Sequence, residues 1–182
     1  MIAKVDSQNI IHQIPPVWDS ESRVLILGTM PSPKSREAGF FYMHPQNRFW
    51  KVLPAVFGEQ LLYPNNSPDR EAAISERRDF LLRHHIALWD VIASCEISGA
   101  ADSSIKNALP NDFSKIFSNS KIKHVFCTGK TAFSLWKKTC AKEYEEHFLL
   151  TVKGLPSTSP ANASWTLEKL IAAYKVIASP RM

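Results

Sequence analysis

The chain has 182 residues, enough for one substantial hydrophobic core and short for two, so we expect residues 1–182 to form a single domain. Apolar residues make up 45% of the chain, which excludes a largely disordered protein, and no apolar run reaches the roughly 18 residues of a membrane-spanning helix. The net charge of +5 favours a polyanionic partner without identifying one, because many basic proteins bind none.

Apolar periodicity predicts strands that alternate with helices. In chain order, we expect a strand at 24–27, helices at 49–57 and 70–83, strands at 86–92 and 124–127, a helix at 131–145, a strand at 147–152 and a helix at 164–178. Pro54 should kink or divide its helix, and Ser164 should cap the last one.

The strand segments are almost continuously apolar, which is typical of strands that are covered on both faces. Alternation with helices implies right-handed crossovers and helices on both faces of the sheet. The predicted fold is therefore of the α/β class, a three-layer α/β/α sandwich around a central, mainly parallel four-stranded sheet. Ligands of such folds bind beyond the carboxyl ends of the strands, so the loops after Gly28, Ile92, Cys127 and Val152 are the candidates for a site.

The first loop, residues 28–50, leaves a buried strand, passes through prolines and small residues, and enters a helix. Pro45 suits the first helical position with His44 flanking it, which would place Asn47 in the first turn with its amide facing the strand ends. A turn with a capping asparagine and a cluster of core aromatics is the alternative interpretation.

The second loop, residues 154–162, directly follows the last predicted strand. Two prolines stiffen a stretch that contains Ser157, Thr158 and Ser159. Hydroxyl and backbone N–H groups held in this way can bind phosphate oxygens without sequence preference. An ordinary proline- and serine-rich loop that leads into a helix is the alternative.

Together the two loops resemble one family. Residues 39–50 are similar to a segment of the mismatch-specific uracil/thymine glycosylases, and the fuller pattern is closer to the hypoxanthine-DNA glycosylases (DNA-deoxyinosine glycosylases) of the uracil-DNA glycosylase superfamily. That pattern comprises Gly28-x-Met30-Pro31, His44-Pro45-x-Asn47-x-Phe49-Trp50, Leu88-Trp89-Asp90-Val91, Ser94-Cys95, Asn111-Asp112 and residues 155–163. Its spaced blocks agree in order over residues 24–177, nearly the whole chain.

Two positions depart from most of the superfamily. Met30 stands where most members have Asp or Asn, and Leu155 stands where many have His. The hypoxanthine-type enzymes share the Met, and in them the Asn of the His-Pro-x-Asn block is taken as catalytic, which corresponds to Asn47. The resemblance further implies that Tyr42 stacks on a flipped base.

The remaining site residues follow from their places in the two loops. Backbone N–H groups near Thr29 and Met30, beside Gly28, would receive charge on the base. Ser157, Thr158 and Ser159 would contact DNA phosphates, and residues 160–163 would fill the gap in the duplex.

The implied reaction breaks an N-glycosidic bond through an oxocarbenium-like sugar, with negative charge leaving on the base. It needs a positioned water, a pocket for the flipped base and donors aimed at the developing anion. The Asn47 carbonyl could orient the water by accepting its hydrogen bond, while the NH₂ group contacts base or backbone.

Other signals are better explained structurally. Gly129-Lys130-Thr131 resembles the end of a phosphate-binding loop, but His124 stands where that motif requires Gly, so we interpret it as a turn into a helix. Asp90 follows a buried strand and could assist water, although a capping or structural carboxylate is the preferred interpretation. His84 and His85 suit a helix end.

Cys95, Cys127 and Cys140 are widely spaced and form no CxxC pair, so we expect reduced thiols rather than a disulfide, zinc site or iron–sulfur cluster. We therefore expect no metal and no cofactor. Charges near the N-terminus, where a signal peptide would be apolar, predict a cytoplasmic protein, and we expect a monomer without membrane contact.

The sequence thus predicts a monofunctional DNA glycosylase that removes a deaminated base, above all hypoxanthine, from DNA. Uracil, xanthine and ethenocytosine remain open as substrates. Two alternatives stand beside it, a glycosidase of free nucleosides or nucleotides and a catalytically silent nucleic-acid-binding relative.

Overall fold

The central sheet consists of four parallel strands. The structure, a computed structural model, describes residues 8–98 and 104–179. The strands are β2 (Val24–Gly28), β3 (Ile86–Asp90), β6 (His124–Thr128) and β7 (Thr151–Leu155), in the spatial order β3-β2-β6-β7. Every residue of β2 is buried, as its continuous apolar sequence predicts for a central strand that is covered on both faces.

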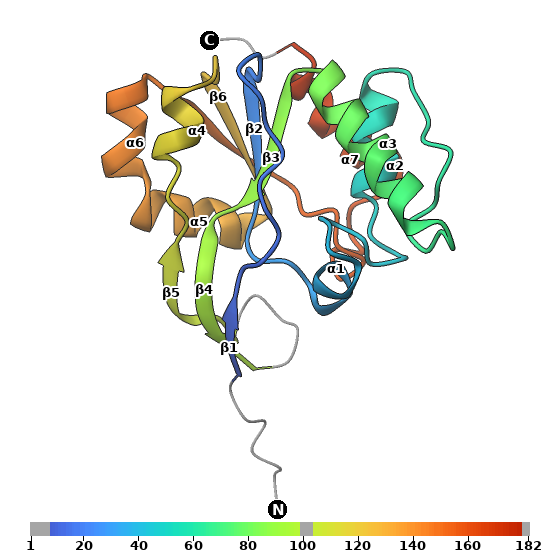
Figure 1. Cartoon of the computed structure of the whole chain (residues 1–182), viewed down its shortest axis with the longest axis horizontal. Helices are drawn as coiled ribbons and strands as arrows, with labels where there is room; N and C mark the ends of the chain where they lie inside the picture. Colours follow the sequence, from blue (N-terminus) through green and yellow to red (C-terminus); the bar gives the residue numbers. More distant parts are fainter. Residues whose placement is uncertain (1–7, 99–103, 180–182) are drawn as a thin grey trace, which may run out of the picture.

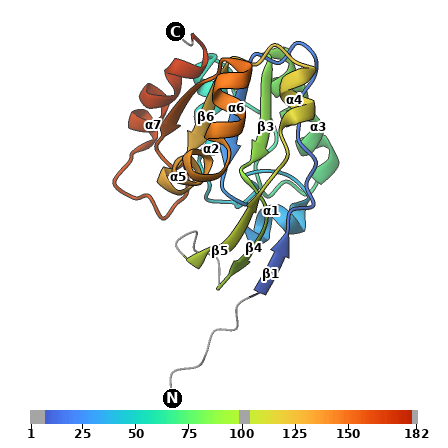
Figure 2. The same cartoon turned by 90° about the vertical axis from the view of Figure 1, so that its left-hand side faces the viewer.

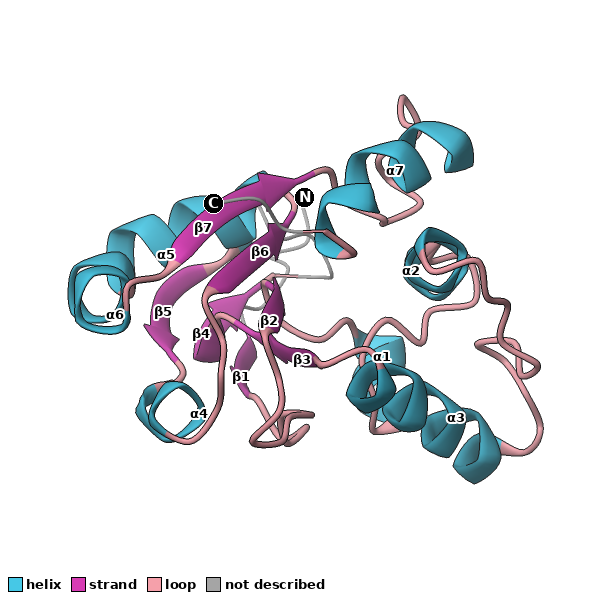
Figure 3. Ribbon diagram, turned by 90° about the horizontal axis from the view of Figure 1, so that it is seen from above, coloured by secondary structure: helices cyan, strands magenta, loops and turns pink. Residues whose placement is uncertain are grey.

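Helices cover both faces of this sheet, which confirms the predicted three layers (Figure 3). Ile26 of β2 packs with α2 (Phe49–Val56), α3 (Arg70–Arg83) and α7 (Leu167–Tyr174) in one core cluster. Leu25 and Leu27 point the other way, into a second cluster with α4 (Ser114–Ser118), α5 (Lys130–Thr139) and α6 (Ala141–Phe148). The period-2 alternation of a strand thus divides its side chains between two apolar cores.

A second, antiparallel sheet was not predicted. It contains β1 (Gln8–Ile11), β4 (Ile92–Ile97) and β5 (Lys106–Pro110) in the order β1-β4-β5, and it extends from the parallel sheet at the lower edge of Figure 1. Figure 2 shows the same extension from the side.

The predicted strand 86–92 is in fact two strands that meet at Val91. The N–H groups of Val91 and Ile92 donate to the carbonyls of Gly28 and Thr29, at 2.9 and 3.1 Å. These bonds extend the parallel pairing just past β3, where the chain passes directly into β4 of the antiparallel sheet.

Three other boundaries also differ from the prediction. His147 and Phe148 end α6 rather than begin a strand, because Leu149 adopts a left-handed conformation with φ 54° and β7 starts only at Thr151. The single helix expected at 131–145 is divided at Cys140 into α5 and α6. The last helix is capped by Thr166, whose side chain accepts from the Lys169 N–H, and not by Ser164.

The helices at 49–57 and 70–83 were predicted closely. Pro54 lies in the last turn of α2 without dividing it, and α2 is followed by α3 after the connection 57–69. A short helix, α1 (Pro33–Ala38), is inserted in the first loop and is capped by Ser32. In the part of the chain that is described, no helix is both long and apolar enough to cross a bilayer.

Candidate active site

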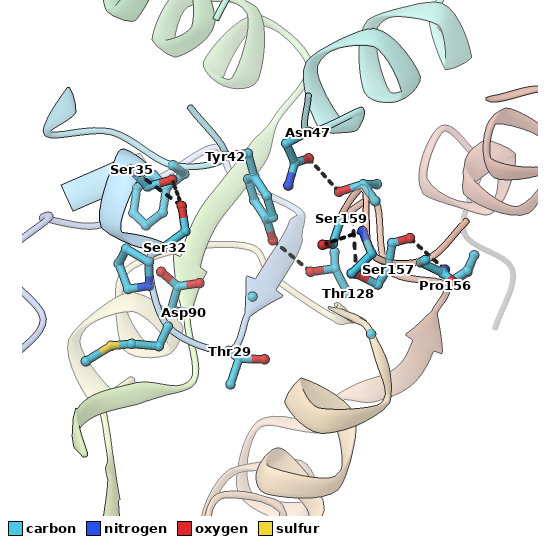
Figure 4. A pocket seen from close by; sticks show the side chains of 18 of the residues that line it. Thr29, Ser32, Ser35, Tyr42, Asn47, Asp90, Thr128, Pro156, Ser157 and Ser159 are labelled. Atoms are coloured by element: carbon cyan, nitrogen blue, oxygen red, sulfur yellow. Dashed lines mark hydrogen bonds between the residues drawn. The ribbon is translucent and has the colours of Figure 1, made fainter. Parts of the chain in front are cut away.

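A cleft of about 1030 Å³ lies at the carboxyl ends of the parallel strands. Both loops contribute to its wall, as Figure 4 shows. The residues predicted for the site all line it, namely Gly28, Thr29, Met30, Tyr42, Asn47, Ser157, Thr158 and Ser159. The structure therefore brings together two segments that are more than a hundred residues apart in the sequence.

Asn47 lies before the helix rather than in its first turn. Pro45 and Gln46 form a turn that is closed by a 2.9 Å bond from the Asn47 N–H to the His44 carbonyl, and α2 begins only at Phe49. The Asn47 side-chain oxygen accepts from the Phe49 N–H, also at 2.9 Å. The predicted helix start at Pro45 was therefore wrong, whereas the predicted direction of the side chain, toward the strand ends, is what the structure shows.

The orientation of the Asn47 amide is fixed by its partners. The Phe49 N–H can only donate, so the atom that it meets must be the amide oxygen, and the Thr158 hydroxyl donates to the same oxygen at 2.9 Å. Both acceptor positions of the oxygen are thus used within the protein. The amide nitrogen is directed into the cleft beside Tyr42 (Figure 4), and no described residue accepts a hydrogen bond from it.

This geometry changes the role expected of Asn47. A carbonyl that accepts from two protein donors is poorly placed to orient a water molecule, whereas the amide NH₂ supplies two N–H donors to whatever fills the cleft. Donors that face a bound group stabilise negative charge that develops on it.

The Asn65 side chain fixes the backbone of the segment that carries Tyr42 and Asn47. The Asn65 side-chain nitrogen lies 3.2, 2.9 and 3.3 Å from the carbonyl oxygens of Tyr42, His44 and Asn47, respectively. Arg77, which is buried, donates to the Asn65 side-chain oxygen at 3.0 Å and thereby fixes its orientation. One asparagine thus organises the turn that carries the site.

Arg48 connects the two loops. Its guanidinium donates to the backbone carbonyls of Ser159 (2.7 Å), Asn162 (3.0 Å), Thr158 (3.3 Å) and Trp165. The backbone N–H of Arg48 also donates to the Thr158 carbonyl, at 3.1 Å. The residue next to Asn47 therefore fixes the second loop against the first.

Tyr42 is held in an uncommon backbone conformation, with φ 57°. Its ring stacks on that of Phe49 at a centroid distance of 3.9 Å, and its hydroxyl lies 2.7 Å from the Thr128 hydroxyl. Left-handed non-glycine residues cost free energy and cluster at functional sites. The predicted stacking on a base remains a prediction, and it concerns the ring face that Phe49 does not cover.

The floor of the cleft, which we define as Gly28 and Asp90, leaves no room for a larger residue at position 28. A Cβ atom there would lie 2.2 Å from the nearer carboxyl oxygen of Asp90 (Oδ1) and 2.8 Å from the Tyr42 hydroxyl. The other carboxyl oxygen, Oδ2, is 2.9 Å from Nε2 of His12, and the two side chains are only 5% and 2% exposed. Burial raises the pKa of the Asp90 carboxyl, and the hydrogen bond and charge of His12 partly oppose this effect.

Asp90 therefore lines the cleft and is paired, whereas the sequence favoured a capping or structural carboxylate and did not indicate the partner. Its residue type and strand-end position were visible, but its partner His12 comes from the segment after β1, for which no strand was predicted. Thr128, Gly129 and Lys130 also line the cleft. They form the predicted turn into a helix, and the loop after Cys127 was one of those singled out, but nothing in their sequence assigned them to the site.

The hydroxyl groups of the second loop do not all face the same way. Thr158 is buried and its hydroxyl is used by Asn47. The hydroxyl oxygens of Ser157 and Ser159 accept the N–H groups of Ser159 and Ala161, at 3.2 and 3.3 Å, which leaves the O–H of each serine to donate. Ser157 and Ser159 are thus able to donate hydrogen bonds to phosphate oxygens, whereas the Thr158 hydroxyl positions Asn47.

No group of three or more His, Cys, Asp or Glu residues that could hold a metal ion occurs among the described residues. Cys95, Cys127 and Cys140 are buried free thiols. Burial raises the pKa of Cys127 to about 12, so this thiol is unreactive near neutral pH.

Comparison with known proteins agrees with the resemblance seen in the two loops. A family model described as the uracil DNA glycosylase superfamily matches residues 15–178. A hypoxanthine DNA glycosylase of Methanosarcina barkeri is 33% identical over 141 residues, which cover 77% of this chain and 84% of the relative. A hypoxanthine DNA glycosylase of Methanosarcina acetivorans is 30% identical over 149 residues, covering 81% and 85%.

A solved structure shows the same fold. The solution NMR structure of a candidate uracil DNA glycosylase from Methanosarcina acetivorans matches with a TM-score of 0.70 at 25% identity, over 93% of this chain and 99% of that chain. The predicted α/β architecture is confirmed by this match and by the sheet order described above.

Proposed function

Because this chain belongs to the uracil-DNA glycosylase superfamily, we propose that it is a monofunctional DNA glycosylase that hydrolyses the N-glycosidic bond of a deaminated base, with hypoxanthine as its principal substrate. The relatives named hypoxanthine DNA glycosylase support this choice of base. The observation that carries the proposal is the Asn47 amide nitrogen, which faces the cleft while its oxygen is held by two protein donors.

The chemistry follows from where charge moves. The bond between C1′ and the base nitrogen breaks with its electron pair going to the base, the oxygen of a water molecule bonds to C1′, and the water's extra proton neutralises the base through solvent. The Asn47 N–H donors would stabilise the negative charge that develops on the base. The step needs no residue that ionises, so Asn47 itself gives the rate no pH dependence.

Two features favour a DNA substrate over a free nucleoside. Ser157 and Ser159, each with an O–H left to donate, line the cleft beside the base position, where the backbone of a flipped nucleotide would run. Arg36 and Lys130 also line the cleft, and the whole chain carries a net charge of +5. A free nucleoside would have no phosphates for these groups to bind. We propose that the protein acts in the cytoplasm.

The test is a panel of oligonucleotides, each with a single hypoxanthine, uracil, xanthine or ethenocytosine, that is incubated with purified protein and then cleaved at abasic sites. We expect the fastest release from the hypoxanthine oligonucleotide and at least a tenfold slower reaction with free 2′-deoxyinosine. Tight binding to the damaged oligonucleotides without release of any base would show a silent binding protein. Equal rates on the oligonucleotide and the free nucleoside would show a nucleoside hydrolase.

A further inference from the structure

The depth of Asp90 in the cleft determines which part of a bound base it can meet. A flipped nucleotide enters with its base first, because the sugar remains attached to the DNA backbone outside. The groups at the floor therefore face the base edge that lies opposite the glycosidic bond. In a purine this edge carries N1 and the substituent at C6. Asp90, whose side chain is 5% exposed and lies directly against Gly28, belongs to the floor.

Resting on the function proposed above, we propose that His12 and Asp90 form a base-reading pair that selects purines with a hydrogen on N1. The Asp90 oxygen at the floor, Oδ1, would accept a hydrogen bond from N1–H of hypoxanthine. Adenine presents a lone pair at N1, so two acceptors would face each other in a buried site, which is costly. The pair thus separates hypoxanthine from adenine. It does not separate hypoxanthine from guanine, which also carries a hydrogen on N1.

His12 keeps Oδ1 of Asp90 a hydrogen-bond acceptor in both protonation states of the pair. The buried Asp90 carboxyl holds a proton more readily than an exposed one would, since burial raises its pKa. With Nε2 of His12 at 2.9 Å from Oδ2, the hydrogen-bonded proton lies between these two atoms, whichever of them carries it. Oδ1 is therefore an acceptor in both protonation states, and the base meets the same hydrogen-bonding pattern in each.

The position of His12 is itself well determined. Its backbone N–H donates to the Ala93 carbonyl at 2.7 Å, as a continuation of the pairing between β1 and β4. Its ring packs between those of Phe41 and Trp89, at centroid distances of 6.1 and 6.2 Å. The small antiparallel sheet thus delivers a specificity-determining side chain to the back of the cleft, which gives this otherwise separate sheet a function.

The experiment compares single-turnover release of hypoxanthine with that of unsubstituted purine, which has a lone pair at N1, from otherwise identical oligonucleotides. Wild-type protein should favour hypoxanthine by roughly 10²-fold, the size expected when a buried acceptor is left without a donor. Asp90→Asn should reduce this ratio at least tenfold and accelerate release of purine, because its NH₂ group can donate to the N1 lone pair. If Asp90 had a merely structural role, its replacement would slow the release of both bases equally.

His12 is tested separately by its pH profile. Among the described residues, His12 is the ionisable side chain paired with the Asp90 carboxyl, and the Tyr42 hydroxyl lies nearby, since a Cβ atom on Gly28 would contact both Asp90 and Tyr42. In His12→Phe the carboxyl loses the partner that lowers its pKa, so the proton can occupy Oδ1. Hypoxanthine release should then decline as the pH falls through the raised pKa, whereas wild type declines much less. His12→Gln, which keeps an N–H donor, should restore most of the wild-type profile.

The outcomes separate this inference from the proposed function. If wild type releases hypoxanthine but shows equal rates on hypoxanthine and purine, the base-reading pair is refuted and the glycosylase function stands; this result needs no variant to fold. Unchanged substrate ratios in Asp90→Asn would refute it equally. If wild type releases no base from any oligonucleotide, both the function and the inference fail.

Discussion

At the scale of single residues, the decisive feature is the direction of one amide group. Asn47 could be identified from the sequence, since it stands in the His-Pro-x-Asn block at a loop that follows a buried strand. Which end of its amide faces the substrate could not, because that depends on the Thr158 hydroxyl, 111 residues away. We therefore propose that Asn47 donates to the base, in place of the expected water-orienting carbonyl.

The replacement Asn47→Asp separates these two roles. Asp keeps an oxygen that can accept from the Phe49 N–H and the Thr158 hydroxyl, so the loop should keep its shape, but it has no N–H to offer the cleft. We expect single-turnover base release to fall by roughly 10²-fold or more, a loss typical of removing a donor to a developing anion. A rate equal to or above that of wild type would show instead that the residue acts as an acceptor for water.

At the scale of elements, the site depends on how the first loop is fixed to the second. The sequence predicted both loops and most of the strands that precede them, because apolar continuity and proline placement are local signals. It misplaced the helix start at Pro45 and the strand at 147–152, where tertiary contacts or a left-handed residue decide the boundary. The antiparallel sheet was missed because β1 and β5 are mostly exposed and lack the apolar continuity of the buried strands, and because β1 pairs with a strand more than 80 residues away.

Arg48 is the connection whose loss should be easiest to measure. Its guanidinium donates to four backbone carbonyls in and beside the second loop, and Met cannot replace any of these bonds. We expect Arg48→Met to lower the free energy of unfolding by roughly 2 to 4 kcal/mol, since hydrogen bonds of charged donors are lost and carbonyls are left unpaired.

The matched control is Lys51→Met, three residues further along the chain, in α2 and at an exposed position. It should change the free energy of unfolding by no more than about 0.5 kcal/mol. Denaturant titrations of both variants measure the difference. Equal stabilities would mean that the bonds of Arg48 contribute little and that the two loops are held together by other contacts.

At the scale of the whole molecule, the fold places a cleft and hydroxyl donors on the carboxyl edge of one sheet, in a chain whose net charge is +5. The net charge alone did not identify a binding partner, since basic residues occur as short groups along the chain. If the protein binds several DNA phosphates, counterions are released and the logarithm of affinity should fall linearly with the logarithm of salt concentration, with a slope of about −0.9 per phosphate contact.

Binding measured by fluorescence anisotropy between about 50 and 200 mM salt tests this prediction on a duplex with one hypoxanthine. A second duplex with an abasic-site analogue shows how much of the affinity comes from the backbone alone. A flat response would argue against phosphate binding and in favour of a nucleoside substrate.

The most direct test of the account is the rate of base release by Asn47→Ala, measured in a single turnover beside its affinity for the same DNA. We predict that release of hypoxanthine falls by roughly 10²-fold or more, while the affinity for DNA changes less than about threefold. The affinity should be kept because the hydroxyl groups that would donate to DNA phosphates lie in the second loop. Asn66→Ala, an exposed asparagine beyond the site, is the control, and thermal unfolding verifies that both variants fold. Near wild-type release by folded Asn47→Ala would contradict the account.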